Sequence, residues 1–178
     1  MKIVVLSGSP HKHGTTAKLV DSFIAGAKEA GHEVVRFDTV FMKVHPCIAC
    51  EKCHASDGAK CAFQDDMVTI GAALAEAECI VLATPIYYYG ICTQLKTVID
   101  RFYAIEPAIR KGQKTAFITA MADDRPETVA AANASYRAAI EWMEWKDCGI
   151  VNAFACTTVE DLAGKDYEAQ AYDLGKKI

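Results

Sequence analysis

The feature of this sequence that most constrains its fold is a regular alternation of short apolar runs with longer amphipathic segments. The first run, residues 3–6, reads Ile-Val-Val-Leu, a mostly β-branched pattern that is typical of a strand covered on both faces of a parallel sheet. Further strands are predicted over 34–37, 80–83, 115–119 and 149–155, and helices over 19–27, 67–77, 95–102, 126–143 and 167–177. Five strand-then-helix units predict an α/β protein with a doubly wound parallel sheet.

Length, charge and apolar content narrow the class of protein further. A chain of 178 residues with 52% hydrophobic residues suits a single domain, 1–178, with a full core. The net charge of −4 argues against a nucleic-acid partner, which needs a basic surface. No apolar run approaches the roughly 20 residues of a membrane helix, and residues 1–7 are too short for a signal-peptide core. We therefore expect a cytoplasmic protein with no membrane partner.

One connection breaks the alternation. Residues 39–65 join a strand to a helix with about 27 residues, where 2–6 are usual, and they hold four of the eight cysteines. A long loop of this kind usually carries function. Because no export signal is visible, we expect the cysteines to serve metal, redox or packing roles rather than a disulfide framework.

The loop after the first predicted strand has the composition of a phosphate cradle. In open α/β sheets, ligands bind beyond the carboxyl ends of the strands, and the first turn of the next helix offers free N–H groups to an anion. Gly8 and Gly14 allow close approach of the backbone. Hydroxyl groups and positive charges come from Ser9, His11, Lys12, Thr15 and Thr16. The alternative is a solvated turn followed by a helix that Thr15 caps. The two glycines fit neither a dinucleotide fingerprint nor a Walker loop.

A second loop of interest follows the third predicted strand, which Pro85 is expected to end. It contains three consecutive tyrosines, at 87–89, and then Gly90. Tyrosine rings are costly to expose without a partner surface, so a flat aromatic ligand would explain them. The alternative is that one or two rings pack on the domain and the third lies in a subunit contact.

These motifs fall in an order that resembles a known family. The set is Gly8-Ser9-Pro10 with Gly14-Thr15-Thr16, Cys47-x-x-Cys50-x-x-Cys53 with Cys61, Asp65-Asp66-Met67, Thr84-Pro85-Ile86-Tyr87-Tyr88-x-Gly90, and Lys96 with Asp100-Arg101-Phe102. Over roughly residues 2–120 the chain resembles the flavodoxin-like NAD(P)H-dependent FMN reductase family, including its iron–sulfur flavoprotein branch. The resemblance implies five parallel strands in the order 2-1-3-4-5, helices on both faces, and FMN bound at the carboxyl edge of the sheet.

The resemblance also implies which residues bind FMN. The phosphate would be held by Ser9, His11, Gly14, Thr15 and Thr16. The isoalloxazine would be lined by Pro85, Ile86, Tyr87, Tyr88 and Gly90. The third flavin loop, 119–124, would contribute Thr119, Ala120 and Met121. His11 stands where the family usually has Arg, and Thr15 where it usually has Asn, so Lys12 is expected to compensate for the lost charge.

The cysteine loop allows three interpretations. Cys47, Cys50, Cys53 and Cys61 resemble the ligands of a 4Fe–4S cluster, in which four thiolates converge on one small cube. Four thiolates also suit zinc. Relatives with a similar loop are also thought to lack a cluster, so the third interpretation is free or partly oxidised thiols in a surface loop. The other four cysteines are expected to be small core residues.

The chemistry implied by the resemblance needs no catalytic residue of the protein, because the flavin carries it. NAD(P)H would reduce FMN, and a small acceptor such as a quinone or a flavin would then take the electrons. The alternative is an electron carrier in which FMN and a cluster exchange electrons with ferredoxin. The sequence names neither the acceptor nor the choice between NADH and NADPH. A homodimer or homotetramer is expected, with Tyr89, Trp142 and Trp145 as apolar contact area. The alternative for the two tryptophans is a place in the core.

Overall fold

The computed structural model describes all 178 residues. Its strands are β1 (Lys2–Ser7), β2 (Glu33–Asp38), β3 (Cys79–Tyr87), β4 (Gly90–Ile91), β5 (Lys114–Ala120) and β6 (Lys146–Ala153). Its α-helices are α1 (Thr15–Glu29), α2 (Met67–Glu76), α3 (Thr93–Asp100), α4 (Glu106–Ile109), α5 (Glu127–Met143) and α6 (Tyr167–Lys177). Four short 3-10 helices complete the list: η1 (Thr39–Phe41), η2 (Lys52–His54), η3 (Arg101–Ala104) and η4 (Val159–Leu162).

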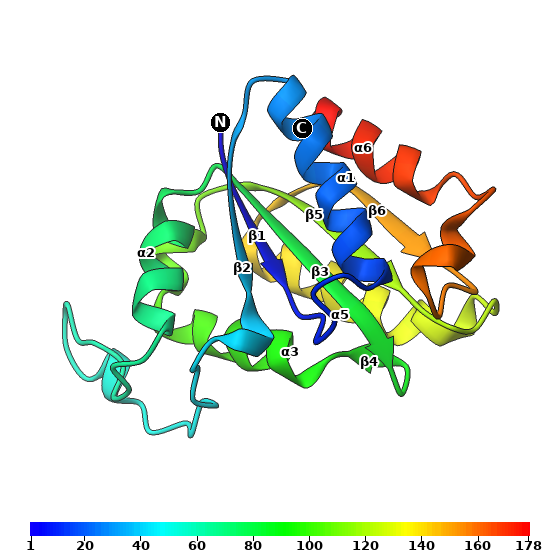
Figure 1. Ribbon diagram of the computed structural model, residues 1–178. Helices are drawn as coiled ribbons and strands as arrows, with labels where there is room; N and C mark the ends of the chain where they lie inside the picture. The colour runs from blue at the N-terminus through cyan, green and yellow to red at the C-terminus, as the bar shows by residue number, and fades with distance from the viewer.

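The five long strands form one parallel sheet in the order β2-β1-β3-β5-β6 (Figure 1). Counted over these five strands, this is the predicted order 2-1-3-4-5. The two-residue strand β4, which the sequence did not predict, pairs antiparallel with the end of β3. The strand order reverses at β1 and β3, so the loops that follow these two strands flank the crevice in which such sheets bind ligands.

Alternate side chains of the strands enter two separate cores. Val4 and Leu6 of β1 pack with apolar residues of α2, α3 and α5, whereas Ile3 and Val5 pack with those of α1 and α6. The expectation of helices on both faces is therefore confirmed. Helices α1 and α6 lie side by side in Figure 1, and glycine permits their close approach, because a Cβ at Gly26 would lie 2.0 Å from the carbonyl oxygen of Tyr172.

Strand β3 does not end at Pro85, as the sequence predicted, but continues to Tyr87. The reason is that one side of β3 has no neighbouring strand beyond Ala83. β1 pairs with β3 only as far as Ala83, so on that side Pro85 has no neighbouring strand to which an N–H would donate, and proline is tolerated at such positions. Strand β6 similarly begins at Lys146, three residues before the predicted start.

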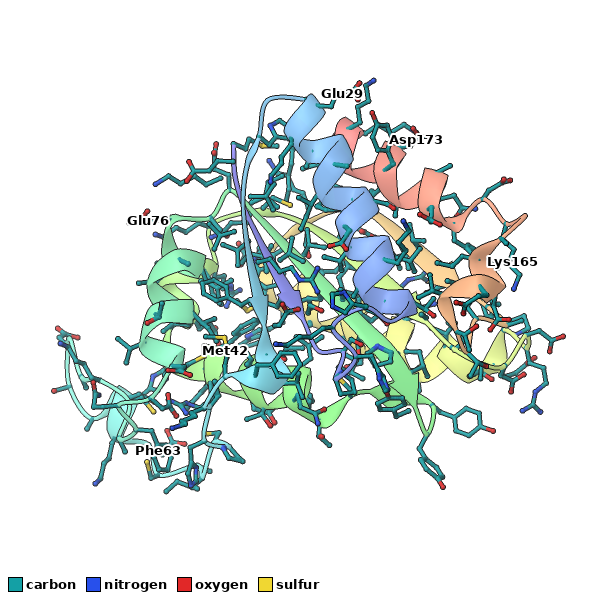
Figure 2. All side chains as sticks on the ribbon, viewed as in Figure 1. Glu29, Met42, Phe63, Glu76, Lys165 and Asp173 are labelled. Carbon is teal, nitrogen blue, oxygen red and sulfur yellow. The ribbon has the colours of Figure 1, made fainter.

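The cysteine loop, residues 39–65, contains only η1 and η2 and projects beyond α2 at the lower left of Figure 1. Figure 2 labels Phe63 in this projecting segment and Met42 near the end of β2, where the loop leaves the sheet. No helix of the chain is long and apolar enough to cross a membrane.

The two tryptophans expected at a subunit contact have different environments. Trp145 is buried in the core and donates its ring N–H to the carbonyl oxygen of Ile109 at 2.6 Å. Trp142 is 62% exposed, with the Arg110 guanidinium over its ring. Of the two alternatives for Trp145, the core position is therefore correct and the subunit contact is wrong, because its ring packs against Phe102 within the core rather than facing solvent.

Candidate functional site

Three loops at the carboxyl edge of the sheet border one open cavity of about 290 Å³. The loops follow β1, β3 and β5, which are the three that the sequence analysis selected. Ten predicted residues line the cavity: Ser9, His11, Gly14, Thr15, Thr16, Pro85, Ile86, Tyr87, Ala120 and Met121. Three further residues complete the wall: Ala122, Cys156 and Thr157.

The first loop is held in place by backbone contacts. Gly8 donates its N–H to the Ala83 carbonyl oxygen at 2.8 Å, and the Cys92 thiol donates to the Gly8 carbonyl oxygen at 3.1 Å. A Cβ at Gly8 would lie 2.4 Å from the Cys92 sulfur, so this position requires glycine. Further along, the Ser9 hydroxyl accepts the His11 N–H at 3.2 Å. The loop is therefore a preformed turn that leads into α1.

Thr15 begins α1 but does not cap it. Gly14 is the N-cap, and no side chain caps the helix. The Thr15 hydroxyl is buried, with 6% of the residue exposed, and has no hydrogen-bond partner. A buried hydroxyl without a partner costs about 1–3 kcal/mol, and this one lines the cavity next to the free N–H groups of a helix N-terminus. The arrangement fits a phosphate, which accepts hydrogen bonds from both kinds of donor.

The tyrosine loop is a tight hairpin. Tyr87 pairs with Gly90 across it, and the two residues between them have positive φ, +46° at Tyr88 and +65° at Tyr89. Bulky residues rarely adopt this conformation, and such strain concentrates at functional sites. Tyr87 is among the residues that line the cavity, although it is 47% exposed, and partial burial raises the pKa of its hydroxyl. Tyr88 points away and is fully exposed.

The four remaining predicted residues do not line the cavity. Tyr88 is on the outer side of the hairpin and Gly90 is in β4. The Lys12 ammonium lies over the Phe41 ring, 4.6 Å from its centre. The Thr119 hydroxyl donates to the side-chain oxygen of Asn152 at 2.7 Å.

Cys156 and Thr157 are the cavity residues that the sequence reasoning missed. They follow β6 and reach the site because Cys156 donates its N–H to the Met121 carbonyl oxygen at 2.8 Å. Ala155, just before them, has φ +50°. Burial raises the pKa of the Cys156 thiol, although the nearby Lys165 ammonium opposes this. A sharp turn after the last strand leaves no regular pattern in the sequence, so only this long-range contact reveals the two residues.

The four cysteines of residues 39–65 line a second, much smaller cavity of about 20 Å³. Cys47 and Cys50 are exposed, whereas Cys53 and Cys61 are half-buried. Left-handed residues stand on either side of Cys50, with φ +51° at Ala49 and +56° at Glu51. The Ala49 N–H points to the Cys47 sulfur at 3.5 Å. The left-handed conformation of Ala49 and Glu51 is costly for residues other than glycine, so the surrounding structure must hold the backbone in this turn around the cysteines.

No three Cys, His, Asp or Glu side chains of the chain lie close enough together to hold one metal ion. The four thiols therefore share a cavity without converging on a single point. A zinc site needs four sulfurs around one ion, whereas in a cluster each thiolate binds a different iron.

A buried ion pair closes this loop at its base. The Arg101 guanidinium is 2% exposed and donates to both carboxylate oxygens of Asp65, at 2.9 and 3.3 Å. Burial on its own would raise the pKa of Asp65, but the guanidinium and the N–H groups of His45 and Met67 lower it below its usual range. Asp66 is the N-cap residue of α2, but its side chain does not cap the helix. The carboxylate that accepts an N–H of the first helical residue is that of Asp65, which accepts the Met67 N–H at 3.1 Å.

The expectation for the remaining cysteines mostly agrees with the structure. Cys79, Cys92 and Cys156 are buried, and Cys148 is half-buried. Burial raises the pKa of Cys79 to about 12, so its thiol is inert at neutral pH.

The strand order and the cavity at its reversal define a flavodoxin-like protein. Residues 1–147 match the family described as NADPH-dependent FMN reductase. The chain belongs to this family.

The chain is also similar to individual proteins. An iron–sulfur flavoprotein of Archaeoglobus fulgidus is 30% identical over 132 residues, which are 73% of this chain and 59% of that protein. One from Methanosarcina thermophila is 38% identical over 104 residues, which are 57% of this chain and 52% of that protein. The chain thus spans about half to three-fifths of the length of these relatives. The structure of the NAD(P)H:quinone oxidoreductase from Methanothermobacter marburgensis has a TM-score of 0.73 at 13% identity, covering 99% of this chain and 97% of that chain.

Proposed function

We propose that the protein binds FMN in the three-loop cavity and acts as an NAD(P)H-dependent oxidoreductase that passes electrons to a small acceptor such as a quinone or a flavin. The observation that carries this proposal is the buried, unpartnered Thr15 hydroxyl beside the N-terminus of α1. Membership of the NADPH-dependent FMN reductase family supports it.

The residues of the first loop would hold the phosphate. Ser9 and Thr16 line the same wall as Thr15, and the positive end of the α1 dipole favours an anion there. The loops after β3 and β5 present mostly apolar side chains, among them Ile86 and Met121, which suit the flat face of a ring system. FMN, when bound, supplies a hydride acceptor at its N5 atom.

The protein's own part in the reaction is to bind, to orient and to exclude water. Burial raises the pKa of Cys156, the one thiol of the cavity, and so disfavours the reactive thiolate, although the Lys165 ammonium lies 3.6 Å from its sulfur. We therefore assign no catalytic residue.

A second function is favoured by the cysteine loop. We propose that Cys47, Cys50, Cys53 and Cys61 bind a 4Fe–4S cluster and that the protein carries electrons between FMN and a partner such as ferredoxin. The four thiols around one cavity support this proposal, as do the names of the iron–sulfur flavoproteins to which the chain is similar.

Both functions are tested on protein purified without oxygen. Chromatography of the flavin released on denaturation should yield FMN; FAD, or no flavin after reconstitution, would contradict the first proposal. Iron and sulfide near four each per chain would support the cluster. Zinc near one per chain, or no metal, would remove the carrier function and leave the reductase alone.

The kinetics separate the two functions from each other. Rapid bleaching of the bound flavin by NADPH or NADH supports the reductase. Slow bleaching by both nucleotides, with fast reduction through ferredoxin, supports the carrier.

We also propose that the protein forms a homodimer or homotetramer. Tyr88, Tyr89 and Trp142 are 101%, 51% and 62% exposed, and exposed aromatic rings are typical of subunit contacts. Sedimentation at micromolar concentration tests this, and a stable monomer with full FMN affinity would contradict it.

A further inference from the structure

Arg101 is the most deeply buried charged residue of the chain. The three nitrogens of its guanidinium group differ in their hydrogen bonds. One terminal nitrogen, Nη1, donates to the His45 carbonyl oxygen at 2.7 Å and to Asp65 at 2.9 Å. The other, Nη2, donates to Asp65 at 3.3 Å. The third nitrogen, Nε, is buried and has no partner.

Arg101 and Asp65 together join the two ends of the cysteine loop. Asp65 also accepts the N–H of His45 at 2.8 Å, and the Arg101 guanidinium lies over the Phe63 ring at 5.4 Å. His45 precedes Cys47, and Phe63 follows Cys61. The pair therefore fixes the segments that enter and leave the sulfur-lined cavity.

Arg101 also faces the thiols. It lines the same cavity as the four cysteines, and Cys61 lies near enough to the guanidinium to help raise its pKa. A buried N–H without a partner is costly. A sulfur that binds iron carries negative charge and accepts a hydrogen bond more strongly than a neutral thiol does.

We propose that Arg101 is a positioning residue for the cluster, that its Nε–H donates to the sulfur of Cys61, and that the Arg101–Asp65 pair sets the reduction potential of the cluster. This inference rests on the proposed iron–sulfur function. It goes beyond that function, because it assigns roles to two residues that are not ligands.

The electrostatics give the two residues opposite effects. Hydrogen bonds to the sulfurs and nearby positive charge stabilise the reduced cluster, which carries one more electron, and so raise its potential. The Asp65 carboxylate cancels much of the positive charge. Arg101→Gln should therefore lower the potential, and Asp65→Asn should raise it.

A purely structural role predicts a different result. Each substitution breaks the same ion pair, so a pair that only holds the loop together would give the same loss in both variants. The sign of the shift in potential therefore separates tuning of the cluster from support of the loop.

The experiment compares wild-type protein with Arg101→Gln and Asp65→Asn after anaerobic reconstitution with ferrous iron, sulfide and FMN. Iron and sulfide are counted per chain. The potential is then measured by dye-mediated titration, with the electron paramagnetic resonance signal of the reduced cluster as the readout. The FMN absorbance in the same sample is an internal reference, because the flavin cavity is built from other loops.

Matched controls come from a second ion pair of the same charge type. Arg110 donates to Glu144, and neither residue lines the cysteine cavity. Arg110→Gln and Glu144→Gln should leave both potentials unchanged. Arg101→Lys retains the positive charge but not the guanidinium, so its potential should fall less than that of Arg101→Gln.

Opposite shifts in Arg101→Gln and Asp65→Asn, with an unmoved flavin potential, are the expected result. Unchanged potentials, shifts in the same direction, or loss of iron from both variants would overturn the inference. Wild-type protein that binds FMN but no iron would overturn the cluster proposal itself, and this inference with it.

Discussion

Replacing Thr15 by valine should change the stability of the FMN-free protein and its affinity for FMN in opposite directions. The substitution exchanges a buried hydroxyl for a methyl group of similar size. In the FMN-free protein that hydroxyl has no partner, and its burial costs about 1–3 kcal/mol. Thr15→Val should therefore raise the free energy of unfolding, by about 1 kcal/mol or more.

The affinity for FMN should fall in the same variant. A hydrogen bond to a charged group contributes about 1.5–3 kcal/mol, and each 1.4 kcal/mol is a factor of about ten in the dissociation constant. Thr15→Val should weaken FMN binding by about 10- to 150-fold. Urea unfolding of flavin-free protein measures the first quantity, and titration of flavin fluorescence measures the second.

Thr115 provides a matched control. Its hydroxyl is also buried, but it donates to the Ile80 carbonyl oxygen at 2.8 Å and lies outside the cavity. Thr115→Val should lower the stability by about 1 kcal/mol and leave the FMN affinity unchanged. The reasoning is refuted if Thr15→Val destabilises the flavin-free protein as Thr115→Val does, or if it leaves the affinity for FMN unchanged.

Three further predictions concern packing, strain and thiol reactivity. Gly26→Ala should lower the free energy of unfolding by about 3 kcal/mol or more, because the added Cβ meets backbone atoms of α6. Gly71→Ala in α2, where a Cβ has ordinary contacts, should instead raise it by up to about 1 kcal/mol. Equal effects of the two substitutions in urea unfolding would contradict the account of α1–α6 packing. The double substitution Tyr88→Asn with Tyr89→Gly should stabilise the hairpin by about 1–2 kcal/mol, because this turn favours Asn-Gly. It should also slow turnover with the acceptor if the two rings serve the site. A loss of stability would show that the two rings are packed against the protein in solution. At pH 8, iodoacetamide should modify the exposed Cys47 and Cys50 of metal-free protein and spare Cys79, whose pKa burial raises to about 12; mass spectrometry that finds Cys79 modified in folded protein would contradict its burial.

Much of the fold could be predicted from the sequence because the three central strands, β1, β3 and β5, are buried and largely apolar runs. The run at residues 3–6 is apolar at every position, since Val4 and Leu6 enter one core while Ile3 and Val5 enter the other. Two-sided burial of this kind occurs in doubly wound sheets, whereas the strand order was expected only from the resemblance to the FMN reductase family. The loops that end at the carboxyl edge could then be named, and ten of their residues line one cavity.

The details that could not be predicted depend on long-range contacts. Pro85 continues a strand because β1 ends before it, which no local pattern shows. Tyr88 points outward because the hairpin has only two residues between its strands. Cys156 reaches the cavity through a hydrogen bond to Met121. The partnership of Asp65 with Arg101 spans 36 positions of the chain, and two adjacent aspartates in a sequence do not reveal which of them is buried.

A crystal structure of the protein reconstituted with FMN tests the central claim most directly. Our account predicts the FMN phosphate within hydrogen-bond distance of the Thr15 hydroxyl, at the N-terminus of α1, with the isoalloxazine between residues 85–87 and residues 120–121. FMN bound at another surface, or a three-loop cavity that stays without flavin at saturating FMN, would contradict it.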